Sequence, residues 1–231
     1  MLATVAVLVV LLFVNLLNNK WAKRFYLLVC LVATAVLLAI ARIDGITWTQ
    51  LGLNKSSWQN GIIWSVIVIV AVTVFYAIAA SLPFTRAGFA DKRAAEGGYR
   101  RVFYHSVIRI PFGTALMEEV AFRGVLLAVV TLSWGVVAGV VVSSIVFGLW
   151  HVLPSLDFHD SHDATARIGD SKKAKASSVV ATVLGTAAAG VGFCVLRLWT
   201  DSLFPPIALH AALNGIGFAV SWGLARRLRD L

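Results

Sequence analysis

Three charged side chains interrupt an apolar stretch near the middle of the chain: Glu118, Glu119 and Arg123, within ALMEEVAFRG. An ionisable group inside a membrane helix costs from about 2.5 kcal/mol upward, and such groups usually face a bundle interior or a wet cavity, where they serve chemistry or transport. A carboxylate held there can act as a general base. The two glutamates are therefore the first candidates for chemistry.

The spacing of the three charges assigns them different tasks. On a helix, Glu119 and Arg123 lie four residues apart on one face and can form an ion pair. We interpret this pair as structural rather than catalytic, because each side chain satisfies the other. Glu118 points about 100° away and has no local partner. Glu118 is therefore the carboxylate available for reaction.

Two further motifs place polar groups in apolar segments, FGLWH at 147–151 and HAALN at 210–214. In each motif the end residues share a helix face. Phe147 would pack beside His151 and limit water around it, while His210 and Asn214 present an imidazole and an amide together. A single membrane histidine usually bridges helices. Together with Glu118, however, these residues form a candidate site.

The chemistry that this set suggests is amide hydrolysis. That reaction needs a water made nucleophilic, a proton donor for the leaving amine and donors where negative charge develops. Two histidines and one glutamate, here Glu118, His151 and His210, are also a set that can bind zinc or another divalent metal with one position open. The HExxH helix of many zinc proteases is absent, and a metal-free glutamate mechanism remains equally open.

The elements that must position these residues are expected to be membrane helices. The 231-residue chain is 59% hydrophobic and only 13% charged, with a mean hydropathy of +0.86, which is too apolar for a soluble domain. We expect one all-α integral membrane domain, with N-terminal spans and a basic connector in 1–100 and the motif-bearing core in 101–231. Seven segments have about the length of a membrane span: 1–18, 25–42, 61–82, 107–131, 134–153, 178–199 and 203–224.

The basic residues predict how the chain is oriented. The net charge is +9, and most Lys and Arg residues follow the first, third, fifth and seventh apolar segments. Cytoplasmic flanks carry such an excess, so the N-terminus is expected outside and the C-terminus in the cytoplasm. The clustering in short loops argues against nucleic-acid binding. The first segment lacks a basic flank and a convincing cleavage site, so we expect a retained helix.

Several local features indicate structural roles. We expect a loop or interfacial segment at 43–60, a helix start near Pro111, and a polar loop at 154–177 that includes the His- and Asp-rich residues 157–163. Gly135 and Gly139 offer small surfaces for helix packing. Tryptophans near span ends, including Trp150, are expected at the membrane interface. Cys30 and Cys194 fall in apolar segments and indicate no disulfide framework.

The motifs EEVAFR, FGLWH and HAALN, in this order on successive apolar segments, resemble those of the CPBP intramembrane protease family, which comprises CAAX prenyl endopeptidases and Abi or bacteriocin-processing proteins. The resemblance covers about the C-terminal half. It implies that Glu118 is the base that activates water and that His151 assists it. It also implies that His210 and Asn214 hold the oxyanion and that Glu119 and Arg123 support the site. Members of this family are often called metalloproteases.

We therefore expect an intramembrane endopeptidase in a multi-pass protein of the cell membrane, acting on membrane-associated peptides or proteins in a cavity that faces the cytoplasm. In a host without protein prenylation, peptide maturation or bacteriocin immunity would be more plausible than CAAX processing. Two alternatives use the same residues. One is an ion- or proton-coupled transporter, and the other is a non-catalytic immunity or scaffold protein.

Overall fold

The computed structural model describes residues 2–89, 98–159 and 172–227, and every regular element in these ranges is a helix. This confirms the expected all-α fold. A chain in lipid must satisfy its backbone groups within each segment, which helices do. The α-helices are α1 (Leu2–Leu16), α2 (Tyr26–Ile43), α3 (Trp48–Leu51), α4 (Trp58–Ser81), α6 (Tyr99–Phe103), α7 (Leu116–Glu119), α8 (Leu127–Trp150), α9 (Val152–His159), α11 (Lys172–Thr200) and α12 (Phe204–Arg227).

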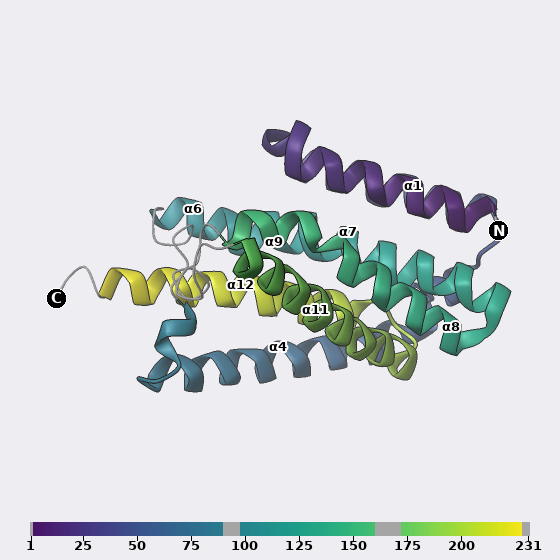
Figure 1. The fold of residues 1–231 in the computed structure, drawn as a ribbon. Helices are drawn as coiled ribbons and strands as arrows, with labels where there is room; N and C mark the ends of the chain where they lie inside the picture. Colours follow the sequence, from purple (N-terminus) through teal and green to yellow (C-terminus); the bar gives the residue numbers. More distant parts are fainter. Residues whose placement is uncertain (1, 90–97, 160–171, 228–231) are drawn as a thin grey trace.

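Six helical stretches of the described chain are long and apolar enough to cross a membrane, and one of them, Tyr99–Leu156, turns back on itself. The reversal lies at Gly135, whose φ of 85° and ψ of 165° leave the helical region. Figure 1 shows the resulting hairpin at one end of α8. With this turn the chain has the expected seven apolar segments.

The two glycines near this turn have different roles. Gly135 adopts a positive φ that side chains rarely tolerate, and a Cβ there would meet nothing within 4 Å. The expectation that Gly135 serves helix packing was therefore wrong, and it forms the turn. A Cβ at Gly139 would collide with Thr131, so Gly139 does provide a close contact.

The helix that carries Glu118 begins earlier than predicted. It starts with α6 at Tyr99 and continues through the π-helical segment η5 (Tyr104–Ala115), α7 and the π-helical segment η6 (Val120–Leu126). Pro111 lies inside η5 and does not start the helix. Proline breaks the regular i→i−4 ladder of an α-helix, and in η5 that ladder is replaced by i→i+5 bonds.

Two segments expected as loops contain short helices. Within 43–60, α3 is capped at its N-terminus by Thr47, whose side chain forms a reciprocal capping box with Gln50, and at its C-terminus by Gly52 with a φ of 75°. Within 154–177, α9 extends to His159 and α11 begins at Lys172. Residues 160–171 and the side chains of 157–159 lie outside the described part, so the expectation for the His- and Asp-rich segment is untested.

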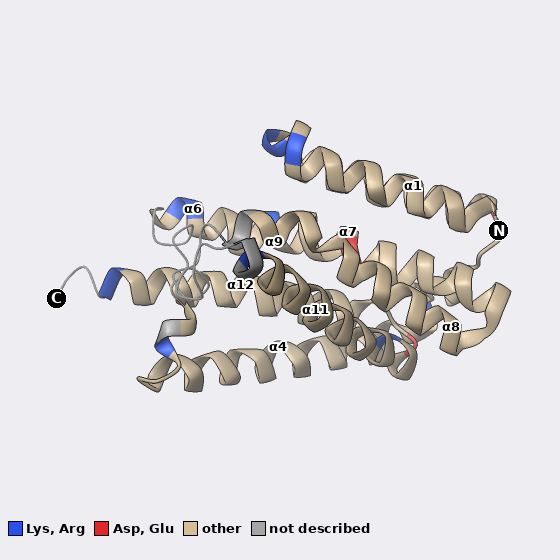
Figure 2. Cartoon of the chain, in the orientation of Figure 1, with Lys and Arg blue, Asp and Glu red and all other residues tan. Residues whose placement is uncertain are grey.

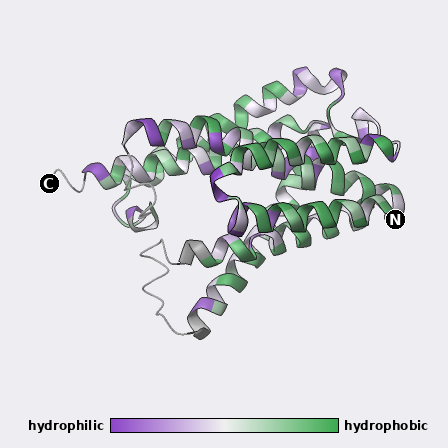
Figure 3. Ribbon diagram, turned by 90° about the horizontal axis from the view of Figure 1, so that it is seen from above, coloured by the Kyte–Doolittle hydropathy of each residue, from purple (hydrophilic) through white to green (hydrophobic). Residues whose placement is uncertain are grey.

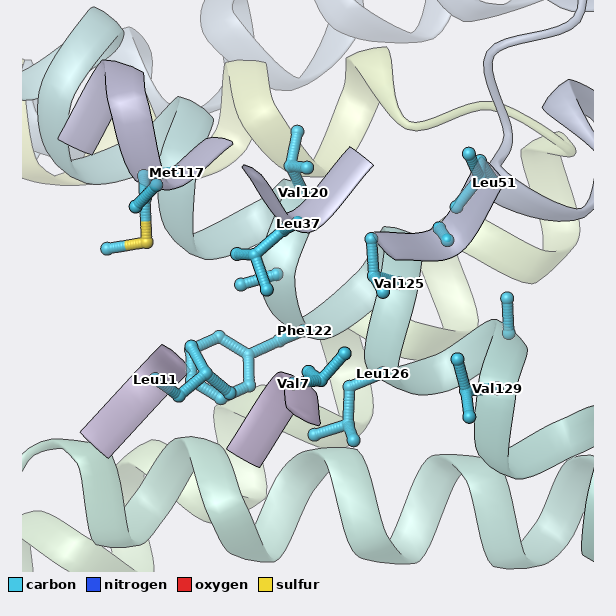
Figure 4. Packing of buried hydrophobic residues seen from close by; sticks show 14 of the residues in the cluster. Val7, Leu11, Leu37, Leu51, Met117, Val120, Phe122, Val125, Leu126 and Val129 are labelled. Atoms are coloured by element: carbon cyan, nitrogen blue, oxygen red, sulfur yellow. The ribbon is translucent and has the colours of Figure 1, made fainter. Parts of the chain in front are cut away.

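The helices form a bundle around the segment from η5 to η6. α12 packs most extensively against α4 and η5, while α11 packs against α8 (Figure 1). Val7 and Leu11 of α1 pack near Phe122 and Leu126 of η6 (Figure 4). Apolar residues also cover much of the outside (Figure 3). Among the six stretches, Trp48–Ser81, which contains α4, is the least buried. Because lipid is as apolar as this surface, close packing rather than water exclusion holds the helices together.

Candidate active site

Glu118 and Glu119 lie on α7, a single α-helical turn between the π-helical segments η5 and η6, and both side chains are buried. Figure 2 shows this acidic position beside the label α7, within a bundle whose other charges lie mostly near its ends. π-Helical turns are frequent at functional sites. Both carboxylates are therefore held inside the bundle, as expected from the sequence.

Glu119 is the centre of a three-residue unit. Its Oε1 lies 3.2 Å from Arg123 Nη1, which confirms the predicted ion pair. The same oxygen lies 2.7 Å from Nδ1 of His210, on α12. Glu119 thus does more than neutralise Arg123, because it links α7 to α12 and fixes the orientation of the His210 ring.

Arg123 is fully buried and is surrounded by aromatic rings. Its Cζ lies 3.9 Å from the ring centroid of Phe147 and 4.8 Å from that of Phe193. Cation–π contacts of this kind replace part of the hydration that a buried guanidinium has lost. Phe147 and Phe193 therefore help to keep the cation, and with it Glu119, in place.

His210 faces both glutamates. Because a carboxylate only accepts hydrogen bonds, we assign the Nδ1 proton of His210 to the contact with Glu119. The other ring nitrogen, Nε2, lies 3.9 Å from Glu118 Oε2. This separation is too long for a direct hydrogen bond but is suited to a bridging water.

Glu118 is held by a residue that the sequence analysis placed elsewhere. Trp150, at the end of α8, is buried and donates a hydrogen bond from Nε1 to Glu118 Oε1 over 3.0 Å. The expectation that Trp150 lies at the membrane interface was therefore wrong. No described residue donates a hydrogen bond to the second oxygen of Glu118, Oε2.

The position of Trp150 depends on α1. In a continuous helix the carbonyl of Trp150 would accept from residue 154, but Pro154 has no N–H. Asn15 of α1 donates to this carbonyl from Nδ2 over 3.0 Å. The N-terminal helix thus satisfies a backbone group beside the site, a contribution that we did not predict.

His151 follows Trp150 and is half-buried. Its Nδ1 lies 2.7 Å from the Phe147 carbonyl, and the two rings pack edge to face with centroids 4.7 Å apart. The predicted contact between Phe147 and His151 is confirmed. The Phe147 ring also lies 6.2 Å from that of His210, so it separates the two histidines.

Asn214 lies one turn beyond His210 on α12, and its side chain is exposed, whereas His210 is buried. The next residue, Gly215, approaches the backbone of Ser106 in η5 so closely that a Cβ would lie 2.8 Å from the Ser106 carbonyl oxygen. α12 therefore packs tightly against η5 beside Asn214. A role for Asn214 in catalysis stays a prediction.

The described residues include no group of three or more His, Cys, Asp or Glu side chains arranged to hold a metal ion. In particular, His210 directs Nδ1 to Glu119 and Nε2 toward Glu118, and His151 directs Nδ1 to a backbone carbonyl. These contacts do not form the expected three-ligand set of Glu118, His151 and His210.

Three residues that contact the site were not predicted, and the sequence patterns that could have indicated them are weak. Trp150 lies three residues after Phe147, so a helix places both on one face toward Glu118. Phe193 is an aromatic residue in a stretch rich in glycine and alanine. No sequence pattern indicated Asn15, because its partner lies 135 residues away.

Residues 101–216 match a family model described as type II CAAX prenyl endopeptidase, Rce1-like. No curated protein and no solved structure matches the chain. The matched range contains all seven residues predicted for the site, and α1 to α4 lie before it.

Proposed function

The chain belongs to the Rce1-like type II CAAX prenyl endopeptidase family, a family of membrane proteases, and from this we propose that it is an intramembrane endopeptidase in which Glu118 activates the attacking water. The observation that carries the assignment is the buried Oε2 of Glu118, which no described residue saturates and which faces His210 Nε2 at 3.9 Å. A partly desolvated carboxylate is a stronger base than one at a surface.

The two oxygens of Glu118 have separate tasks in this mechanism. Oε1 accepts the Trp150 hydrogen bond and fixes the carboxylate plane. Oε2 accepts a proton from the water that attacks the scissile carbonyl carbon. The C–N bond then breaks, and Glu118 returns this proton to the leaving amine. The proton taken from water is thus the one that leaves with the amine product.

The remaining groups stabilise charge and orient the water. The Nδ1 of His210 is held by Glu119, which in turn pairs with Arg123, so His210 presents Nε2 to the reacting atoms. In this mechanism Nε2–H donates to the oxyanion together with the amide of Asn214. His151 orients the water. Each of these steps uses only side chains of this chain, and a divalent metal at Glu118, His151 and His210 stays an untested alternative.

The substrates that we propose are membrane-associated peptides or proteins, as a protease within a bilayer requires. The family name directs the first trial to peptides that end in a CAAX sequence with a prenylated cysteine. Cleavage of the prenylated peptide but not of the unmodified one would assign this specificity. Cleavage of both at similar rates would favour a wider role in peptide maturation.

The test of the base is Glu118→Gln in proteoliposomes that contain such peptides. Loss of a general base lowers the rate by about 10²- to 10⁴-fold. Asp201→Asn is the matched control, because it removes an exposed carboxylate outside the site at a left-handed position that asparagine tolerates. Helix content and thermal unfolding should be unchanged in both variants.

The same preparation separates the alternatives. Undiminished cleavage by Glu118→Gln would refute the assigned base. Proton flux that depends on Glu118, with no peptide cleaved by the wild-type chain, would instead support the transporter.

A further inference from the structure

A hollow of about 490 Å³ opens beside the first turns of α2, away from Glu118 and His210. One wall comes from the 3₁₀ segment η2 (Lys23–Phe25) and the start of α2, and the other from the first turns of η5. Its volume is within the range of small-molecule sites. The lining residues are Lys23, Arg24, Phe25, Tyr26, Leu27, Leu28, Leu31, Tyr104, His105 and Arg109.

The charged residues that line this hollow are basic. Lys23, Arg24 and Arg109 line it, and none of its described lining residues is acidic. The Cζ of Arg109 lies 4.0 Å from the Tyr26 ring centroid, and that of Arg24 lies 4.6 Å from the Phe25 ring centroid. A ring contact restricts a guanidinium while leaving its N–H edge free to hydrogen-bond an anion in a bidentate manner.

The place of the hollow in the bundle indicates where the anion comes from. It lies between the end of α1 and the helix that begins with α6, at the end of the bundle where Lys and Arg gather (Figure 2). From the basic residues, Leu28 and Leu31 continue along α2 with side chains 59% and 42% exposed. Along a helix these two leucines lie about 4.5 Å apart. The hollow therefore joins a cationic mouth to an apolar wall that faces lipid.

We propose that this hollow binds an anionic phospholipid, with the headgroup phosphate on Arg24 and Arg109 and one acyl chain along Leu28 and Leu31. Basic pockets between membrane helices recognise lipid headgroups in this way. A free phosphate would use only the cationic mouth and would leave the leucine wall unused. An anionic phospholipid uses both parts.

The hollow also contacts the helix that carries the site. The Tyr26 hydroxyl lies 2.9 Å from Thr114 Oγ1, one turn before Glu118, and a Cβ on Gly113 would lie 3.2 Å from the Tyr26 ring. A bound lipid would therefore restrain η5 where it leads into α7. This consequence does not depend on the reaction that Glu118 performs.

The test uses the full chain in phosphatidylcholine nanodiscs with a trace of spin-labelled phosphatidylglycerol. The immobilised component of the spin-label spectrum measures bound lipid. Arg24→Gln with Arg109→Gln should lower the preference for phosphatidylglycerol over phosphatidylcholine by about 25-fold, since each basic side chain contributes roughly a fivefold factor. The matched control is Arg226→Gln with Arg227→Gln, which removes the same charge at the same end but outside the hollow.

The control variant should keep the immobilised component within about twofold of wild type, given the short reach of screened charges. Leu28→Asn should weaken lipid binding while leaving both arginines in place. Equal losses in the two double variants, or no loss in either, would overturn the proposal. Displacement of the lipid by millimolar inorganic phosphate would reassign the hollow to a free anion, and displacement by a cleavable peptide would reassign it to substrate. Thermal unfolding of each variant shows that it is folded.

Discussion

At the scale of residues, the site depends on the difference between two adjacent glutamates. Glu119 binds both Arg123 and His210 through Oε1, whereas Glu118 accepts from Trp150 through Oε1 and directs Oε2 toward His210 Nε2. The sequence correctly predicted the Glu119–Arg123 pair through its i, i+4 spacing, a local relation, and the reactive role of Glu118 stays a prediction. It could not identify Trp150 as a partner, because tryptophan near a span end more often lies at the interface.

Trp150→Phe tests the positioning of Glu118. The phenyl ring retains most of the packing and removes the N–H donor. Hydrogen bonds to charged groups contribute about 1.5–3 kcal/mol. We therefore expect kcat to fall by roughly ten- to a hundredfold with KM nearly unchanged, measured in a steady-state peptide assay. Trp134→Phe, at an exposed tryptophan near the Gly135 turn, is the control and should keep wild-type kcat. A changed KM with normal kcat in Trp150→Phe would contradict a role in orienting the base.

At the scale of elements, the end of α8 beside the glutamates is held by two neighbouring helices, of which α1 lies outside the matched region. α1 reaches the site through Asn15, which binds the Trp150 carbonyl that Pro154 leaves without a helical partner. On the opposite side, Gly148 of α8 lets α11 approach, since a Cβ there would lie 2.7 Å from the Val183 carbonyl oxygen. The end of α8 is thus fixed by both neighbours.

Asn15→Ala should therefore affect both stability and activity. The substitution removes the bond to the Trp150 carbonyl and a second bond that Asn15 Oδ1 accepts from Asn19 Nδ2. Each costs about 0.5–1.5 kcal/mol, seen as a lower Tm in detergent. The same change should lower kcat several-fold, because Trp150 loses a constraint. Asn60→Ala is a matched control, since Asn60 makes a similar 3.1 Å bond from α4 to the Thr200 carbonyl, outside the site. If both variants lose equal activity, the effect of Asn15 is one of general stability.

At the scale of the whole molecule, the chain is a multi-pass membrane protein with an uneven charge distribution. Basic residues concentrate at the end of the bundle that carries the C-terminus (Figure 2). Positive charge is retained on the cytoplasmic side during insertion, so this end is predicted to face the cytoplasm.

Single-cysteine labelling tests this orientation. In a background where the buried Cys30 and Cys194 are replaced by alanine, Arg227→Cys should react with a membrane-impermeant maleimide only from the cytoplasmic side. Lys55→Cys, exposed in the segment between α3 and α4, should react only from outside. The reverse pattern would invert the topology and move the basic hollow to the outer leaflet.

The sequence by itself determined the helical class, the seven apolar segments and the Glu119–Arg123 pair, because hydropathy and helical spacing are local properties. It predicted the break between 107–131 and 134–153 but assigned Gly135 to helix packing rather than to the turn. It missed α9, because a short helix and a loop can share a composition. The tertiary structure alone decided that His210 lies between the two glutamates, 91 residues from Glu119, and that Asn15 and Trp150 meet. These contacts between distant residues depend on the distance between neighbouring helices. Glycines and π-helical turns set that distance, and no local sequence pattern encodes it.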